Sequence, residues 1–257
     1  MSKKKITAVA IGVVVLMLVL VGCGAQPAAK TQILKVGSDT TYAPFGFQDE
    51  KTKEYIGFDI DIIKAIGKQA GYDVQIQSMN FDGLIPALDG GSIDVAISDM
   101  TINDERAKKV NFSKPYYIAG LSIVVKTDNT TVKSVKDLEG KRIAVSIGST
   151  GADEAKKINN AKITEFNTIA EAFLELNAGG VDAVINDLPV NEYYILHAGG
   201  NNAKIVGESL NSEPLGIATS KKNPELGDKV NKALDELKKN GEYEKIYVKW
   251  FGKKPPQ

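Results

Sequence analysis

The stretch SDMTINDER, from Ser98 to Arg106, brings together side chains that are suited to holding a small charged molecule. Arg106 offers a planar guanidinium group that can grip a carboxylate through two parallel hydrogen bonds. Thr101 adds a hydroxyl group shortly after an apolar run that ends at Ser98. Asp104 and Glu105 lie beside the arginine, so a surface salt bridge is the alternative explanation of the same pattern.

A second stretch of the sequence resembles the residues that lead up to Asp99. ALDGGSIDVAISD, ending at Asp99, is similar to LNAGGVDAVIND, ending at Asp187. Each contains a helix end, a Gly-Gly pair suited to a helix C-cap, and a short apolar strand. Parallel α/β sheets bind ligands beyond the carboxyl ends of their strands, so we expect the two aspartates to face each other across a cleft between similar lobes. Chance similarity within a generic α/β pattern is the alternative.

Short apolar runs alternate with amphipathic helices along the chain. The pattern predicts strands at residues 33–36, 74–78, 93–98, 142–147, 163–166 and 181–186. It predicts helices at residues 59–69, 81–88, 155–158, 169–177, 190–197 and 224–251, the last interrupted at Gly241. Repeated βα units of this kind indicate an α/β fold with parallel sheets covered by helices.

The sequence lacks the short motifs of common enzyme classes. No G-x-x-x-x-G-K, H-E-x-x-H, C-x-x-C or G-x-S-x-G occurs, and no G-x-G-x-x-G follows a strand. His197, the single histidine, lies among tyrosines and a leucine on an expected helix, where packing or surface exposure explains it better than catalysis. One cysteine and one histidine cannot form a Cys/His zinc site, so we expect no metal and no cofactor.

The first 22 residues predict a secretory signal that ends at a lipid attachment point. Lys3, Lys4 and Lys5 precede an uncharged run too short to span a bilayer, and Leu-Val-Gly-Cys23 resembles a bacterial lipobox. We therefore expect a removed signal peptide at residues 1–22, an acylated Cys23 and a tether at residues 23–32. A transmembrane anchor, or an ordinary signal with an incidental cysteine, is the alternative.

The length of 257 residues suits two lobes of about 100 residues each, and 43% hydrophobic and 25% charged residues are ordinary for a globular protein. The chain holds 32 basic and 32 acidic residues, so it carries no net charge that would attract nucleic acid. Removal of the signal takes away three lysines and no acid, which leaves a mildly acidic domain.

Several motifs occur in a fixed order from Ile33 to Phe251. They are YAPFGF at 42–47, GFDID at 57–61, FDGLIPAL at 81–88, TINDER at 101–106, FSKPYY at 112–117, SVKDLEG at 134–140, GSTG at 148–151, Asn186-Asp187 and YVKWF at 247–251. Together they resemble the polar amino-acid-binding proteins of bacterial ABC importers, solute-binding protein family 3. The ordered set is far more specific than any one motif.

The resemblance implies a two-lobed periplasmic-binding-protein fold of type II, joined by two hinge crossings. Lobe 1 would combine residues 33–120 with 215–257, and lobe 2 would comprise residues 121–214. The crossings would lie near residues 118–122 and 213–216. The lobes would close on a ligand by hinge bending.

The resemblance also assigns roles to individual residues. Arg106 would clamp the ligand α-carboxylate, with Thr101 and the backbone around Asp99 helping to hold the carboxylate and the α-ammonium group. Thr150 would donate to the carboxylate from a turn before a helix, and Asp187 would pair with the ammonium group. The aromatic residues Tyr42 and Phe81 would enclose the ligand side chain and Asp39 would read it, with core packing or a turn role as the alternatives. Three neighbours complete the expected set: Ser98, Met100 and Ser146.

Asp99 departs from the pattern of relatives that bind neutral ligands, many of which carry a small residue at this position. A carboxylate there, together with Asp39 and two aromatic faces, would suit a cationic side chain, because aromatic faces attract ammonium and guanidinium groups. We therefore expect arginine, lysine or histidine rather than glutamine. The alternative is that Asp99 points away from the ligand or caps the next turn.

The expected protein is a non-enzymatic, monomeric receptor outside the cytoplasmic membrane, held there by its lipid. Its partners would be a free amino acid and a membrane permease driven by a cytoplasmic ATPase, and it would not bind nucleic acid. A glutamine receptor of the same family is the first alternative. A dehydratase of small acids and a ligand sensor on the same fold are the others.

Overall fold

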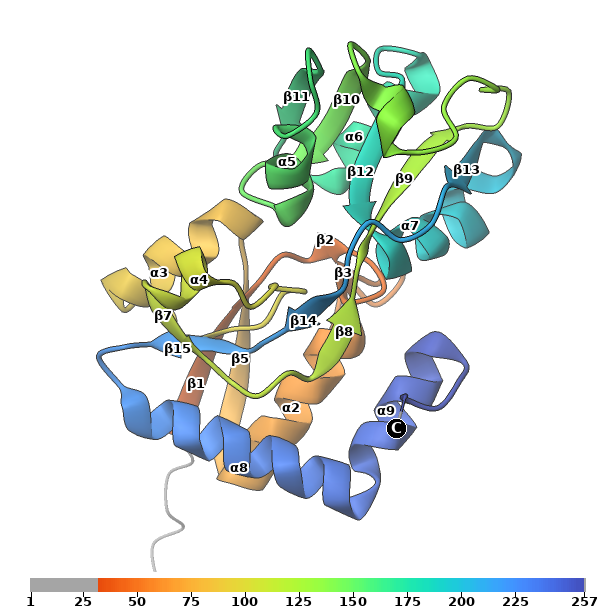
Figure 1. Ribbon diagram of the computed structural model, residues 1–257. Coiled ribbons are helices and arrows are strands. Elements are labelled where there is room, and N and C mark those ends of the chain that lie inside the picture. Colours follow the sequence, from red (N-terminus) through yellow and green to blue (C-terminus); the bar gives the residue numbers. More distant parts are fainter. Residues whose placement is uncertain (1–31, 257) are drawn as a thin grey trace, which may run out of the picture. The chain divides into compact units, whose positions relative to one another are not determined.

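The computed structural model describes residues 32–256 (Figure 1). The expected signal peptide, Cys23 and all but the last residue of the expected tether lie outside the described residues. Gln32, the last tether residue, already belongs to the first strand. Within the described part of the chain, no helix is long and apolar enough to cross a membrane.

The first five-stranded sheet has the order β5-β1-β6-β15-β7. Strands β5 and β6 run parallel to β1, whereas β15 is antiparallel to both of its neighbours. The bounds are β1 Gln32–Ser38, β5 Tyr72–Ser78, β6 Val95–Ala96, β7 Val110–Phe112 and β15 Ala218–Ser220. The sheet therefore combines strands from the beginning of the chain with one from near its end.

The second five-stranded sheet has the order β11-β10-β12-β9-β13. Strands β11 and β12 run parallel to β10, whereas β9 is antiparallel to β12 and to β13. The bounds are β9 Leu121–Lys126, β10 Arg142–Ser146, β11 Lys162–Phe166, β12 Ala183–Asp187 and β13 Ala203–Val206. Both sheets are mixed rather than wholly parallel. The expectation of parallel pairing holds for β5, β1 and β6 and for β11, β10 and β12, which are linked by connections that contain helices.

The helices cover these sheets as the amphipathic pattern predicts (Figure 1). Their bounds are α2 Phe58–Ala70, α3 Leu84–Gly90, α4 Asp104–Ala107, α5 Thr150–Ala155, α6 Ile169–Ala178, α7 Leu188–Tyr194, α8 Pro224–Asn240 and α9 Glu242–Phe251. Short 3-10 turns occupy Phe81–Gly83, Val135–Leu138 and Gly200–Asn202, and a π-turn follows α7 at Ile195–Gly199. Three short strands, Thr41–Tyr42, Gly46–Gln48 and Tyr55–Ile56 (β2, β3 and β4), form a small meander.

Glycines end the helices of the repeated motif. Gly91 after α3 and Gly179 after α6 both take the left-handed conformation, with φ of 73° and 80°. A left-handed C-cap is best filled by glycine, which has no Cβ to clash with the backbone. The similarity between the two stretches therefore corresponds to the same local structure, a helix, a glycine cap and a buried strand. Gly241 separates α8 from α9 in the same way.

Several predicted elements differ in extent from the structure, and two of them are instructive. The strand expected at residues 93–98 is assigned only at Val95–Ala96, although Asp94 and Ile97 also donate backbone hydrogen bonds to the first strand. The helix expected at residues 155–158 instead spans Thr150–Ala155, because Ser149 caps its start by accepting from the backbone amide of Ala152. Polar caps, rather than the apolar pattern, set this boundary.

The chain passes between the two sheets twice, and the passing segments pair with each other. Strand β8 (Tyr117–Ala119) leads into β9, and strand β14 (Glu213–Leu215) returns antiparallel to β8. The backbone amide of Ser113 donates to the Ile217 carbonyl at 2.9 Å, and that of Ile217 donates to the Ser113 hydroxyl at 2.9 Å. Such paired crossings bring residues from distant parts of the sequence to the junction of the sheets.

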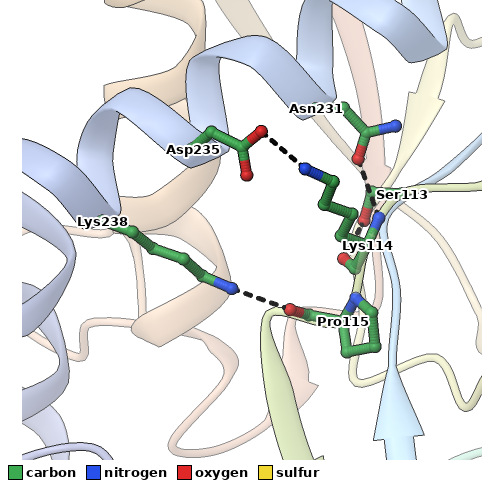
Figure 2. A network of polar contacts seen from close by, with 6 residues as sticks. All are labelled: Ser113, Lys114, Pro115, Asn231, Asp235 and Lys238. Carbon is green, nitrogen blue, oxygen red and sulfur yellow. Dashed lines mark hydrogen bonds and ion pairs between the residues drawn. The ribbon is translucent and has the colours of Figure 1, made fainter.

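Helix α8 is fastened to the turn that precedes the first crossing (Figure 2). The ammonium group of Lys114 contacts Asp235 at 2.7 Å, and its backbone amide donates to Asn231 at 2.7 Å. Lys238 donates to the Pro115 carbonyl at 3.0 Å. Beyond this network, Phe58 is fully buried among aromatic rings of the crossing and of α9, including Tyr116 and Tyr247. The base of the crossing is thus held by both polar and aromatic contacts.

Candidate functional site

One polar cavity brings together almost all of the residues expected to bind a ligand. Its wall contains Asp39, Tyr42, Phe81, Ser98, Asp99, Thr101, Arg106, Ser146, Ser149, Thr150 and Asp187. Its free volume is about 20 Å³, room for about one water molecule. A solute the size of an amino acid can enter only when the walls part.

The cavity lies where strands of both sheets end. Asp39 follows β1, Asp99 follows β6 by a short turn, Ser146 is the last residue of β10 and Asp187 is the last residue of β12. The carboxyl ends of parallel strands are the usual ligand-binding edge of an α/β sheet. As expected, Asp99 and Asp187 therefore contribute to one cavity from equivalent strands.

Met100 is not part of this wall. Its side chain is fully buried in an apolar cluster with Leu84, Leu88 and Val110. The chain turns at Asp99, which has a φ of 48°, so successive side chains diverge. The carboxylate is directed to the cavity wall and the methionine to the core behind it.

Arg106 is held in place while most of its donors stay available. One terminal nitrogen donates to the Thr101 carbonyl at 2.9 Å and the other to the Gly148 carbonyl at 3.1 Å. Phe81 lies against the guanidinium group, with 5.0 Å between the central carbon and the ring centroid. The residue is only 8% exposed, and none of the ion pairs found in the described residues involves it. A guanidinium group has five N–H donors, so the buried charge can still receive a carboxylate.

Tyr42 joins the first part of the chain to Asp187. Its hydroxyl lies within hydrogen-bond distance of Asn186 Oδ1 and donates to Asp187 Oδ2 at 2.7 Å. The other oxygen of Asp187 is buried without a partner. Burial, opposed by the Tyr42 bond, raises the pKa of Asp187 to about 7. The carboxyl group is therefore poised to gain a cationic partner.

Asp99 is the most strained and least satisfied acid of the site. Its φ of 48° is left-handed, a conformation that aspartate and asparagine tolerate better than most residues. Its backbone amide donates to Asp59 at 2.8 Å, whereas both of its carboxylate oxygens are buried without a partner. Burial, and then the nearby Asp187, Asp59 and Glu213 carboxylates, raise its pKa well above the ordinary value. A cation in the cavity would stabilise the ionised carboxylate and offset the cost of burying it.

Asp39 lines the same wall and also stabilises its own turn. Its Oδ1 atom accepts from the Thr41 backbone amide at 2.9 Å and from the Thr41 hydroxyl at 2.7 Å. Burial raises its pKa despite these bonds. Both sequence interpretations of Asp39, a cavity acid and a turn residue, therefore describe the same side chain.

Ser98 and Ser146 complete the expected residues. The Ser98 hydroxyl accepts from the Asp39 backbone amide at 3.0 Å, which ties the ends of two neighbouring strands together. The Ser146 hydroxyl is buried in the wall without a hydrogen-bond partner. It is free to turn its proton toward an incoming solute.

Two polar residues of the site were not predicted from the sequence. Ser149 lines the cavity and caps α5. Glu213 is buried behind the wall, where its Oε2 atom accepts from the hydroxyls of Thr101 at 2.6 Å and Thr150 at 2.8 Å. The Ser-Thr turn before a helix could have indicated Ser149. No sequence signal distinguished Glu213 from the other glutamates, because the two threonines that it binds come from distant segments.

A second hollow, of about 360 Å³, lies over α6 and α7. Its wall is mostly apolar and includes Phe173, Leu174 and Tyr194 together with His197. The imidazole is exposed and stacks on Tyr193 at 3.9 Å between ring centroids. This hollow contains no arginine or carboxylate that could hold a charged solute. Among the described residues, no group of three or more metal-ligating side chains is found.

Two mixed α/β sheets, paired crossing strands and a charged cavity at their junction define a periplasmic binding protein of type II. Two solved structures of an ancestral arginine-binding protein share this fold. The one bound to glutamine is 50% identical with a TM-score of 0.83, covering 86% of this chain and 98% of its own. The one bound to arginine is 49% identical with a TM-score of 0.83, covering 85% of this chain and 98% of its own.

A more particular assignment comes from the sequence. The family model of bacterial extracellular solute-binding proteins, family 3, matches residues 34–253, and the chain belongs to that family. The arginine-binding extracellular protein ArtP of Bacillus subtilis (strain 168) is 34% identical over 238 residues, covering 90% of this chain and 92% of that protein. The resemblance deduced from the ordered motifs is therefore confirmed.

Proposed function

We propose that the protein is the receptor of an ABC importer and binds a free polar amino acid, with a preference for a basic one. The observation that carries this proposal is the cavity itself, which holds one arginine and several acids at the junction of two sheets. A zwitterion presents a carboxylate to the first and an ammonium group to the second. The relatives named above for binding arginine, and the structure with bound glutamine, support the same class of solute.

Each end of the solute meets a different part of the chain. Arg106 would take the α-carboxylate, together with the backbone at the start of α5, because helix N-termini favour anions. Asp187 would take the α-ammonium group on its unpaired oxygen, Oδ1. Arg106 lies on α4, between strands β6 and β7 of the first sheet, and Asp187 ends strand β12 of the second sheet, so both contacts form only when the walls are close. The solute thereby shifts an equilibrium between open and closed arrangements through its differential contacts.

The balance of charge favours a basic amino acid over glutamine. Three aspartates line the wall and Arg106 is the basic residue among them. The two unpaired oxygens of Asp99 offer an ammonium or guanidinium group a strong hydrogen-bond partner. A neutral amide would satisfy these oxygens without neutralising their charge. Glutamine is the alternative solute, which a structure of the ancestral relative with bound glutamine supports.

The choice between these solutes is tested by calorimetry on purified protein with each of the twenty amino acids. We expect arginine or lysine to bind more tightly than glutamine. In the Asp99→Asn variant, which tolerates the same backbone conformation, arginine binding should weaken about 10-fold to 100-fold, the worth of a hydrogen bond to a charged group. Glutamine binding should change less than about threefold, because no charge pair is lost.

The exposed Asp104, close to Arg106 in sequence, supplies the control. Asp104→Asn removes the same charge outside the cavity and should leave both affinities unchanged. Tighter binding of glutamine than of arginine and lysine by the parent protein would contradict the basic preference. An equal loss for both solutes in Asp99→Asn would show that Asp99 does not read the side chain.

The division into lobes follows from the same proposal. Lobe 1 would comprise residues 33–120 and 215–257 and lobe 2 residues 121–214, with bending at the paired strands β8 and β14.

We propose no catalytic role, because the cavity offers acids but no histidine. Recovery of an unchanged amino acid after incubation supports this, whereas turnover of a small acid supports the dehydratase alternative. The sensor alternative would need a separate signalling partner.

The proposed role in transport implies protein partners at the membrane. A membrane permease, powered by a cytoplasmic ATPase, would accept the closed, loaded protein and receive the solute. We propose that the receptor acts as a monomer and does not bind nucleic acid, which agrees with its balanced charge.

Attachment to the membrane would depend on the N-terminal segment. We propose that residues 1–22 are removed and that Cys23 carries the lipid that holds the domain outside the cytoplasmic membrane, in the periplasm or at the cell surface. Mass spectrometry of the protein from its membrane fraction should find an acylated Cys23 as the first residue. In the Cys23→Ser variant the protein should leave the membrane fraction, and retention of an unmodified N-terminus there would contradict the anchor.

A further inference from the structure

Glu213 occupies an unusual position for an acid that does not line the cavity. It lies at the start of the returning strand β14 and is only 6% exposed. Its carboxylate accepts three side-chain hydrogen bonds, from Thr101 at 2.6 Å and Thr150 at 2.8 Å on Oε2, and from Asn211 at 2.7 Å on Oε1. Thr101 and Thr150 both line the cavity; Thr101 follows β6 of the first sheet, and Thr150 begins α5 after β10 of the second.

These bonds fix the direction of the two hydroxyl protons. A threonine hydroxyl has one proton to donate and two lone pairs that can accept, whereas an ionised carboxylate can only accept. Both protons are therefore directed to Glu213 and away from the cavity. The lone pairs of Thr101 and Thr150 are what these residues can offer to a solute.

We propose that Glu213 is a positioning residue that turns the hydroxyls of Thr101 and Thr150 into acceptors for the cationic groups of the solute. This inference rests on the proposed function and deepens it. The two hydroxyl oxygens join the unpaired oxygens of Asp99 and Asp187 in one acceptor-rich wall. The solute carboxylate is then left to Arg106 and to backbone amides rather than to the threonine hydroxyls. This differs from the donor role that the family resemblance assigns to Thr150.

The orientation of the Asn211 amide determines how a side chain at position 213 must face. Its Oδ1 atom accepts from the Leu121 backbone amide at 2.9 Å, so its amide nitrogen faces Glu213. A glutamine at position 213 must direct its carbonyl oxygen toward that nitrogen, because two amide nitrogens cannot bond each other. Its own nitrogen then faces the two threonines and donates to their oxygens. Glu213→Gln thus keeps the shape of the side chain and reverses the polarity of both hydroxyls.

The experiment is a double-mutant cycle measured by calorimetry with arginine on the whole domain. We expect Glu213→Gln to weaken binding about tenfold or more, since two acceptors become donors beside a cation. In a Thr101→Val, Thr150→Val background, where no hydroxyl remains to be turned, the same change should alter affinity less than about threefold. Thermal unfolding without solute checks that each variant is folded.

The outcomes separate this inference from its alternatives. An equal loss in both backgrounds would overturn it, because the charge of Glu213 would then act directly on the solute. Unchanged or tighter binding in Glu213→Gln would also overturn it, because the hydroxyls would then donate to the solute carboxylate. If the double valine background does not fold, each single valine background must show a smaller loss than the parent. Failure of the parent protein to bind any amino acid would defeat the proposed function rather than the role of Glu213.

Discussion

Arg106→Ala is expected to abolish most amino-acid binding, with a loss of about 30-fold to several thousand-fold in affinity. Removing one partner of a buried, hydrogen-bonded charge pair typically costs about 2–5 kcal/mol, because the other charge is left buried and unpaired. The arginine is only 8% exposed and its bonds to two backbone carbonyls already orient it. The solute carboxylate therefore finds a preorganised partner in the parent protein and none in the variant. Calorimetry with arginine and glutamine measures the loss.

Two further variants define what the arginine supplies. Arg106→Lys keeps the charge but lacks the planar fork, so its affinity should lie between those of the parent and the alanine variant. Lys108→Ala removes an exposed cation nearby and should leave binding unchanged. Arg106 also donates to Thr101, so unfolding temperatures must accompany the affinities. Near-normal binding by a folded Arg106→Ala protein would refute the carboxylate role.

Binding of arginine is expected to weaken as the pH falls below about 7. Burial raises the pKa of Asp187 to about 7. Below that pH the carboxyl group gains a proton, which a cationic solute must expel before it can bind. The affinity should therefore fall by up to about tenfold per pH unit between pH 7 and pH 5. Burial also raises the pKa of Asp99 well above its ordinary value, so protonation of that acid adds to the loss. The solute guanidinium remains charged throughout this range.

Neighbouring groups modify the effect of burial on the pKa of Asp187. The nearby Glu213 raises its pKa and Arg106 lowers it, while the Tyr42 hydroxyl stabilises the ionised form. Titration calorimetry in buffers of different ionisation enthalpy should detect proton release near pH 6. Asp187→Asn keeps an acceptor for Tyr42 and should bind weakly at every pH, with less proton release. A parent affinity that does not change between pH 5 and pH 7 would contradict the assignment.

The elements and the pairing of Asp99 with Asp187 could be predicted because both depend on local patterns, whereas most other site residues were expected from the resemblance to the family. The apolar runs ended at polar residues, and the edge of an α/β sheet is where such residues act, so Asp99 and Asp187 could be paired from the sequence alone. The ordered motifs then identified the family. Met100 lies between two cavity residues in sequence, yet the turn at Asp99 directs it into the core. The lobe boundaries remain a prediction.

Glu213 could not be predicted because its role exists only in three dimensions. Its two threonine partners are 112 and 63 residues away in sequence. A glutamate in a polar segment gives no sign that it will be buried or that two threonines will meet it. The mixed character of the sheets has the same origin, since the strands that run antiparallel enter from the crossings rather than from a preceding helix.

The strand order has a consequence for the sequence of events in folding. Strand β15 (Ala218–Ser220) lies between β6 and β7, so the first sheet cannot be completed until residue 220 has been synthesised. All five strands of the second sheet lie between Leu121 and Val206, within one continuous stretch of chain. Contacts between distant residues also form more slowly than local ones. The first sheet therefore starts to be synthesised before the second sheet but can be completed only after it.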